Sequence, residues 1–293
     1  MKIGYPCINN SIGCTANTTF RLASYSPERL KEKVSANLDC LEKTLKFNID
    51  NKLLFFRIGS SLIPFASHPV CDFNWQDYFK NDFSRIGELI KKNKMRISMH
   101  PDQFTLINSI RGDIFERSRR ELIYHNQVLD LLGLNQSHKI QIHVGGVYGE
   151  KEKSIKRFVD RYHQLPERVK KRLVIENDEK SYSLKDCLAI NKKTRIPVLL
   201  DVFHHSLNNN GESVLDCFEK VKNTWKKKDG IPMVDYSTQG KGKRTGSHTD
   251  KLNVKHFKEF IRKTKKLNFD LMLEIKNKEK SALKALKLLS LIN

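Results

Sequence analysis

The sequence predicts a single (β/α)₈ barrel, and two observations support this fold class. Short apolar runs typical of strands alternate with helix-length amphipathic segments about eight times along the 293 residues. This length is close to the roughly 250 residues of a typical barrel of this kind, and no linker, repeat or low-complexity tract divides the chain. We therefore expect one domain spanning residues 1–293. An open doubly wound sheet is the alternative, because alternation alone does not close a barrel.

The first four strand–helix units follow from apolar spacing and helix-start signals. The helix expected over residues 27–47 begins after Ser26, a favourable N-cap, with Pro27 in its first turn. Its apolar residues recur at helical spacing, at Leu30, Val34, Leu38, Leu41 and Leu45. The four expected pairs are residues 2–6 with 27–47, 53–59 with 75–93, 96–100 with 115–132, and 140–144 with 154–169.

The last four units continue the same alternation. Pro197 and the apolar run after it indicate a buried strand that ends in a loop near Asp201. The expected pairs are residues 173–176 with 184–191, 198–202 with 214–225, 233–236 with 254–267, and 271–275 with 282–291.

The composition indicates an intracellular protein with a polyanionic partner. Lys and Arg number 54 against 33 Asp and Glu, a formal net charge of +21. Such an excess favours nucleic acid as the partner, with an anionic membrane surface as the second choice. The alternative is a lysine-rich surface that only keeps the protein soluble and binds no anionic partner. No apolar run reaches about 18 residues, so we expect no membrane span and no signal peptide. The six cysteines lack a C-x-x-C pair, so we expect reduced thiols.

Histidines and carboxylates occur where the predicted strands end, which indicates a metal centre. Each of these residues alone is more often a core or capping group, but the strand ends of a barrel meet at one mouth, where unpaired polar groups are costly. Their mixed imidazole and carboxylate chemistry predicts two or three divalent ions, bridged by a carboxylate such as Glu176 or Asp201. The candidate ligands are His68, His100, His143, Glu176, Asp201, His204, Asp235, His248 and Glu274.

Loops near these strand ends carry groups suited to DNA. Lys241, Lys243 and Arg244 lie in a flexible glycine-containing run that could contact phosphates. The glycine-rich segment around Tyr148 could approach a phosphate closely, although an ordinary glycine turn is the alternative. Four further side chains could stack on or wedge between bases, and these are Tyr5, Asn9, Gln103 and Phe104. Phe104 could equally belong to the core.

Eight motifs together resemble those of the UV damage endonuclease family over nearly the whole chain. They are RIGSS at 57–61, PFASHP at 64–69, SMHPDQF at 98–104, IHVGG at 142–146, END at 176–178, DVFHH at 201–205, SHTD at 247–250 and LEIK at 273–276. The resemblance implies a barrel related to endonuclease IV and up to three divalent ions, usually manganese. It also implies incision immediately 5′ to pyrimidine dimers and 6-4 photoproducts.

The resemblance also implies residue roles and shows one departure. Every candidate ligand except Asp235 matches a family ligand, Gln103 and Phe104 match a lesion-probing Gln-Tyr pair, and Tyr5 and Asn9 match residues near the damage. Many members read Pro-Lys-x-His, with a carboxylated lysine, where this chain has Met233 and Asp235. The lysine role is therefore absent, and Asp235 would supply an oxygen donor or would only orient another ligand.

The sequence thus predicts a metal-dependent DNA repair endonuclease that acts on damaged duplex DNA as a monomer. We expect Mn²⁺, with Zn²⁺ or Mg²⁺ as alternatives, and catalytic roles for Glu176, Asp201 and Glu274. Three other functions are open. They are an abasic-site endonuclease, a metal-dependent sugar isomerase, which the charge of +21 disfavours, and a non-catalytic basic DNA-binding protein, which would leave the strand-end acids without a purpose.

Overall fold

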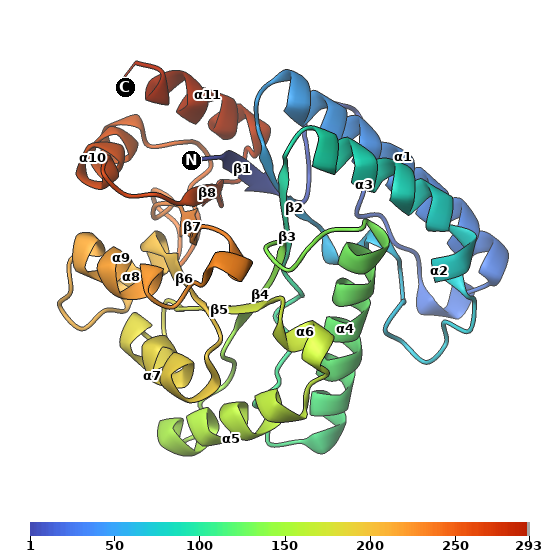
Figure 1. The fold of residues 1–293 in the computed structure, drawn as a ribbon, viewed down its shortest axis with the longest axis horizontal. Helices are drawn as coiled ribbons and strands as arrows, with labels where there is room; N and C mark the ends of the chain where they lie inside the picture. The colour runs from blue at the N-terminus through green and yellow to red at the C-terminus, as the bar shows by residue number, and fades with distance from the viewer. Residues whose placement is uncertain (292–293) are drawn as a thin grey trace.

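The structure is a computed structural model that describes residues 1–291, and its centre is a closed barrel of eight parallel strands. Consecutive strands are neighbours, and β1 pairs with β8 to close the barrel (Figure 1). This closure confirms the predicted (β/α)₈ barrel over the open sheet. The strands are β1 Ile3–Pro6, β2 Phe55–Ile58, β3 Arg96–Met99, β4 Lys139–His143, β5 Leu173–Glu176, β6 Val198–Asp201, β7 Met233–Tyr236 and β8 Asp270–Leu273.

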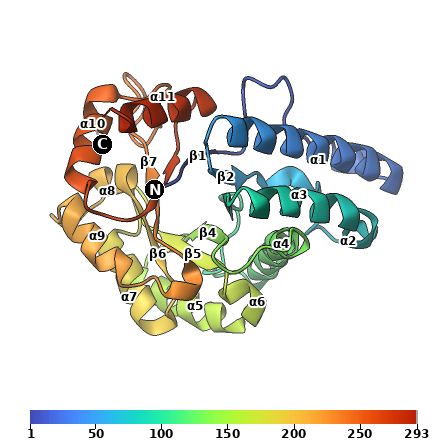
Figure 2. The same ribbon diagram turned by 45° about the horizontal axis from the view of Figure 1, so that its top comes forward.

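Helices surround the strands on the outside in both ribbon views (Figures 1 and 2). The α-helices are α1 Pro27–Asp50, α2 Trp75–Tyr78, α3 Lys80–Lys92, α4 Gly112–Leu131, α5 Lys151–Gln164, α6 Glu167–Lys170, α7 Leu184–Thr194, α8 Val202–Leu207, α9 Val214–Lys222, α10 Val254–Thr264 and α11 Glu279–Leu289. The short 3₁₀ helices are η1 Leu22–Ser24, η2 Ser60–Leu62 and η3 Lys227–Asp229. No helix within residues 1–291 carries an apolar stretch long enough to cross a membrane.

Local chemistry explains where some helices begin and end. Ser26 caps α1 by accepting a hydrogen bond from the Arg29 N–H at 3.2 Å, with Pro27 in the first turn as predicted. The helix expected over residues 154–169 is instead divided into α5 and α6, because Pro166 cannot donate a backbone hydrogen bond in a helix interior. The helix expected over residues 75–93 is also divided, at Phe79, which has a non-helical backbone.

Buried ion pairs close the barrel mouth formed by the strand N-termini. Arg96, the first residue of β3, donates to Asp270, the first residue of β8, at 2.9 Å. Lys139, the first residue of β4, donates to Asp229 at 2.5 Å and is fully buried. Burial lowers the pKa of Lys139 to about 8, against the opposing effect of Asp229. These buried ion pairs occupy the N-terminal mouth of the barrel. A site that a substrate can reach is therefore expected at the opposite, C-terminal mouth.

Two of the six cysteines form a disulfide, so the expectation of reduced thiols is wrong for them. Cys14, in the loop after β1, is bonded to Cys40 of α1, with their Cα atoms 6.0 Å apart. Asn37 of α1 holds this loop, because its side-chain nitrogen donates to the Thr18 carbonyl at 3.0 Å. The pairing depends on the loop folding back over α1, which the spacing of 26 residues does not encode. The other four cysteines are free.

Candidate metal centre

The C-terminal mouth of the barrel brings the predicted acids and imidazoles together. His143 and Glu176 are the last residues of β4 and β5 and lie opposite each other in the strand register. Asp201 ends β6 and lies opposite Asp235 of β7. Glu274 directly follows β8. Because parallel strands present their ends at the same edge, these side chains surround one space.

Three groups of side chains in this mouth could each hold a metal ion, because within each group the ligand atoms all lie within 4.8 Å of one another. Two carboxylates are shared between groups: Glu176 belongs to the first and second, and Asp201 to the second and third. These are the two residues that the sequence suggested as bridging ligands. The groups are His100 with His143 and Glu176, Glu176 with Asp201 and His204, and Asp201 with Asp235 and Glu274.

Hydrogen bonds orient the imidazoles of His100 and His204, and His143 lies at ion-pair distance from Glu176. His100 Nε2 lies 2.8 Å from Glu176 Oε1, and His143 Nε2 lies 3.4 Å from the same oxygen. Asp201 ends β6 and caps α8, because its Oδ1 accepts from the His204 backbone N–H at 2.8 Å. This cap makes α8 begin immediately after the strand and places the His204 ring in the mouth. Its Nδ1 lies 3.1 Å from the Asn177 carbonyl oxygen.

The residues present fit divalent cations. Asp201 Oδ2, Asp235 Oδ1 and His143 Nδ1 are buried and find no hydrogen-bond partner among the described residues. Leaving charged or polar atoms buried without a partner is costly, and buried carboxylates are normally paired or bound to a cation. A donor set of imidazole nitrogens and carboxylate oxygens suits Mn²⁺, Zn²⁺ or Mg²⁺.

The pKa shifts of His204, Asp201 and Asp235 also favour a cation in this cluster. Burial lowers the pKa of His204, but the carboxylates of Asp201 and Glu176 outweigh it and raise that pKa to about 9. Burial raises the pKa of Asp201 to about 6 despite the opposing charge of His204. Burial also raises the pKa of Asp235 well above its ordinary value. These shifts show that positive charge beside Asp201 and Asp235 is favoured, and a divalent ion would supply such charge in competition with protons.

Two buried side chains beneath the mouth were not predicted from the sequence. Arg57 of β2 donates through one nitrogen to Asp235 Oδ2 and to Gln141 Oε1, each at 2.7 Å, and through its other terminal nitrogen to Glu274. Gln141 of β4 in turn donates to Asp235 Oδ2 at 2.7 Å. We call Arg57 and Gln141 the Asp235 clamp. The sequence signal that could have identified them is a polar side chain, Arg57 or Gln141, within an otherwise apolar strand segment.

His248 and His68 lie outside the three groups. The Nε2 atom of His248 is 3.7 Å from Glu274 Oε2, and its Nδ1 is 2.7 Å from the Glu274 backbone oxygen. His248 therefore borders the same mouth, in a cavity of about 410 Å³ whose lining also includes Lys276 and Lys278. His68 is exposed, and its Nδ1 accepts from the Val70 N–H at 3.1 Å.

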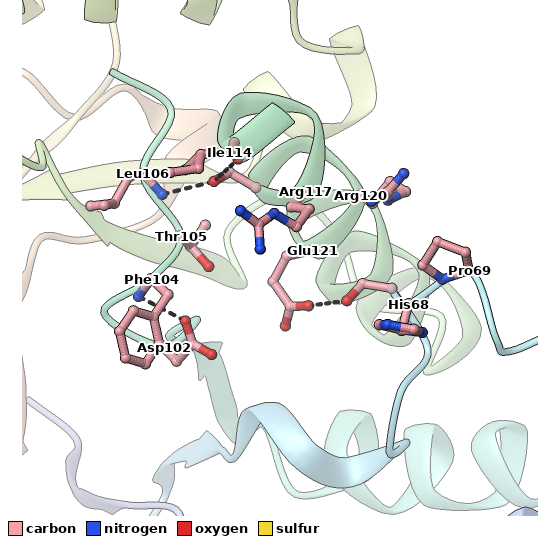
Figure 3. A pocket seen from close by; sticks show the side chains of 12 residues that line it. His68, Pro69, Asp102, Phe104, Thr105, Leu106, Ile114, Arg117, Arg120 and Glu121 are labelled. Carbon is pink, nitrogen blue, oxygen red and sulfur yellow. Dashed lines mark hydrogen bonds between the residues drawn. The ribbon is translucent and has the colours of Figure 1, made fainter. Parts of the chain in front are cut away.

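His68 lines a second cavity, of about 470 Å³, whose other side is formed by Phe104 (Figure 3). Phe104 is 72% exposed, which excludes the alternative that it is core, and Gln103 beside it is exposed too. Arg117 and Arg120 of α4 also line this cavity. An exposed aromatic ring beside cationic side chains is an arrangement suited to bases and phosphates.

The segment around Tyr148 packs closely against the loop that carries Phe104. Gly145 has a φ of +110°, and a Cβ there would lie 2.2 Å from Asn108 Oδ1, so this position requires glycine. Asn108 donates to the Gly146 carbonyl at 2.8 Å and so ties the two loops together. Tyr148 is 40% exposed, and the Arg157 guanidinium lies 5.4 Å from its ring centre.

Tyr5 and Asn9 are buried, in contrast to the remaining DNA candidates. The Tyr5 hydroxyl donates to Asn48 Oδ1 at 2.6 Å and accepts from Asn9 Nδ2 at 2.8 Å. Their polar atoms are engaged within the protein, so this arrangement gives no support to the expected role beside the damage. Burial of polar side chains that bond to one another is a common structural use of Tyr and Asn.

The predicted cationic residues lie together in an exposed loop, which we call the cationic loop (Lys241, Lys243 and Arg244). Gln239 and His248 form a β-bridge at its base, which holds it beside the mouth. Lys243 is paired with Asp250, with its Nζ 2.5 and 2.6 Å from the two carboxylate oxygens.

Comparison with known proteins gives a consistent result along the whole chain. The family model described as UV-endonuclease UvdE matches residues 1–293. A protein of Clostridium perfringens (strain 13 / Type A) named UV DNA damage endonuclease is 39% identical over 295 residues, which cover all of this chain and 72% of that relative.

Solved structures agree with the fold. The crystal structure of SacUVDE is 45% identical and superimposes with a TM-score of 0.95, covering 100% of this chain and 99% of that one. Endonuclease IV from Thermus thermophilus gives a TM-score of 0.60 at 15% identity, covering 86% of this chain and 93% of that one. At this low identity the second likeness shows a shared barrel fold alone.

Proposed function

The chain belongs to the UV-endonuclease UvdE family and is a UV damage endonuclease, and we propose that it incises DNA immediately 5′ to pyrimidine dimers and 6-4 photoproducts. The products would carry a 3′-hydroxyl and a 5′-phosphate. The observation that carries this proposal is the run of three ligand groups joined by Glu176 and Asp201 in the C-terminal mouth. The exposed Phe104 provides a ring that could occupy a disrupted base stack.

The residues of the mouth would hold two or three divalent ions, with Mn²⁺ expected and Zn²⁺ or Mg²⁺ as alternatives. When bound, such ions polarise a phosphoryl oxygen, activate water and stabilise the leaving oxygen. Glu176 and Asp201 would have catalytic roles because each is shared by two ligand groups, and Glu274 would have one as a member of the third group. The other ligands in this proposal are His68, His100, His143, His204, Asp235 and His248.

Other side chains would bind and orient the DNA. The cationic loop, with Lys276 and Lys278 at the rim of the mouth, would contact phosphates. Gln103 and Phe104 would probe the lesion, and Tyr148 would contact the DNA from the adjacent loop. We propose that residues 1–293 act as one domain and as a monomer inside the cell, on damaged double-stranded DNA.

End-labelled duplexes test the reaction, the substrate and the ions together. Separate duplexes carry a pyrimidine dimer, a 6-4 photoproduct, an abasic site or no damage, and each is incubated with Mn²⁺ or with EDTA. We expect a single cut on the 5′ side of both photoproducts that EDTA abolishes. Cutting confined to the abasic duplex would instead identify an abasic-site endonuclease, and cutting that persists in EDTA would refute the metal requirement.

A further inference from the structure

The Asp235 clamp leaves one carboxylate oxygen of Asp235 free. Oδ2 accepts two hydrogen bonds, from Arg57 and from Gln141, each at 2.7 Å. Oδ1 is buried and has no hydrogen-bond partner among the described residues. Asp235 is fully buried, so solvent does not satisfy this atom. The clamp therefore fixes the orientation of the carboxylate and leaves a single acceptor position open.

The free oxygen of Asp235 lies near a second buried carboxylate oxygen that also has no hydrogen bond within residues 1–291. Asp201 Oδ2 is likewise buried without a hydrogen-bond partner in the described part of the chain. Asp201 and Asp235 are register neighbours on β6 and β7, and with Glu274 they form a group whose ligand atoms lie within 4.8 Å of one another. Arg57 pairs with Asp235 and Glu274 from one side, and His204 Nδ1 lies 3.5 Å from Asp201 Oδ2. The two oxygens without hydrogen bonds, together with Glu274, remain a set of oxygen donors suited to a divalent cation.

Arg57 also fixes the third member of this group. One terminal nitrogen of its guanidinium binds Asp235 and Gln141, and the other binds Glu274. A planar guanidinium can serve two carboxylates and an amide oxygen at once, whereas the single ammonium of a lysine cannot hold the same geometry. Arg57 is 3% exposed and Gln141 is fully buried, so neither clamp residue is placed to contact DNA directly.

We propose that Arg57 and Gln141 are positioning residues that hold Asp235 as a ligand, through Oδ1, for a divalent ion shared with Asp201 and Glu274. This inference rests on the proposed metal-dependent function. It assigns Asp235 to direct ligation instead of the orientation of another ligand. Side chains that hydrogen-bond to a ligand in this way typically change metal affinity by about 10- to 100-fold when they are replaced.

Metal titration of the full chain tests the inference without relying on activity. After removal of metals with EDTA and dialysis, Mn²⁺ binding is measured by calorimetry and by electron paramagnetic resonance for the wild type, Gln141→Met and Ser98→Ala. Methionine keeps the length of Gln141 but neither donates nor accepts the clamp hydrogen bonds. Ser98 is a matched control, because it is fully buried on the neighbouring β3 and its hydroxyl has no hydrogen-bond partner among the described residues.

We expect Gln141→Met to weaken one Mn²⁺ site by about 10- to 100-fold, with the remaining sites and the Ser98→Ala control unchanged. Equal affinities in all three proteins would overturn the inference, and so would tighter binding in Gln141→Met, because the Gln141 amide would then oppose metal ligation by Asp235 instead of supporting it. If Gln141→Met does not fold in EDTA by circular dichroism, Asp235→Asn replaces it. Asparagine keeps an oxygen for the clamp donors and loses the anionic ligand, so the same site should weaken.

A double variant shows whether Gln141 affects metal binding through Asp235 or independently of it. Because the clamp acts through Asp235, Gln141→Met added to Asp235→Asn should weaken the site no further, and additive losses would contradict the inference. Failure of the proposed function has a different signature. A wild type that binds no Mn²⁺ and cuts in EDTA refutes the metal-dependent function, whereas a Mn²⁺-dependent wild type with an indifferent Gln141→Met refutes only the role of the clamp.

Discussion

Replacing Phe104 by alanine should separate lesion recognition from stability. Phe104 is 72% exposed, so less than a third of a side chain that buries roughly 200 Å² when fully enclosed is covered by protein. At about 25 cal/mol per Å², the covered part contributes at most about 1.5 kcal/mol to folding. A lost stacking contact with a base would cost about 1–3 kcal/mol of binding free energy, roughly a 5- to 150-fold loss of affinity.

The assay compares the affinity of Phe104→Ala for photoproduct-containing and undamaged duplexes of the same sequence, in EDTA to prevent cutting. We expect the loss to fall almost entirely on the damaged duplex. Tyr78→Ala is the matched control, because Tyr78 of α2 is an aromatic residue that is 57% exposed and has no proposed role. An equal loss on both duplexes, or a drop in melting temperature well beyond that of Tyr78→Ala, would refute the role of Phe104 as a lesion probe.

Three further predictions concern the centre and its surroundings. Glu176→Ala removes a carboxylate shared by two ligand groups, so incision should be lost while binding of damaged duplex in a gel-shift assay is retained; near-normal cutting at saturating Mn²⁺ would contradict it. Replacing the cationic loop by alanines should flatten the slope of log K against log salt by about 2 to 3 units, with Lys243 contributing least because Asp250 already pairs with it; an unchanged slope would place the loop away from DNA. Since the pKa of His204 is raised to about 9, its proton competes with the ion below that pH, so calorimetry should show Mn²⁺ affinity rising with pH and levelling off near 9. A flat profile between pH 7 and 9 would exclude this competition.

Apolar alternation predicted the barrel because each strand and each helix carries its own local pattern. The sequence also placed Asp201 and Glu176 at strand ends, and the closed barrel brings them to one mouth. Boundaries were predicted less well. Pro166 was visible in the sequence and divides a predicted helix, whereas the division at Phe79 has no comparable signal.

Contacts between distant segments account for what the sequence did not predict. Whether Arg57 points inward depends on the stagger of the closed barrel, which apolar patterning does not specify. The sequence around Tyr5 is compatible with either a buried or an exposed tyrosine. Its burial against Asn48 depends on where α1 packs. Cys14 meets Cys40 only because a loop folds back. Each of these features is a property of tertiary packing.

The pairing of β1 with β8 constrains how the chain can fold as it is synthesised. The backbone N–H of Lys2 donates to Asp270 Oδ1 at 2.7 Å across 268 residues of sequence. At the other end of the barrel Glu279 accepts from the Asn10 N–H and the Ser11 hydroxyl, at 2.9 and 2.7 Å. These contacts form only after β8 and α11 have left the ribosome. Until then one edge of β1 has no strand to pair with. Nascent chains stalled before β8 should therefore depend on chaperones more than released chains do.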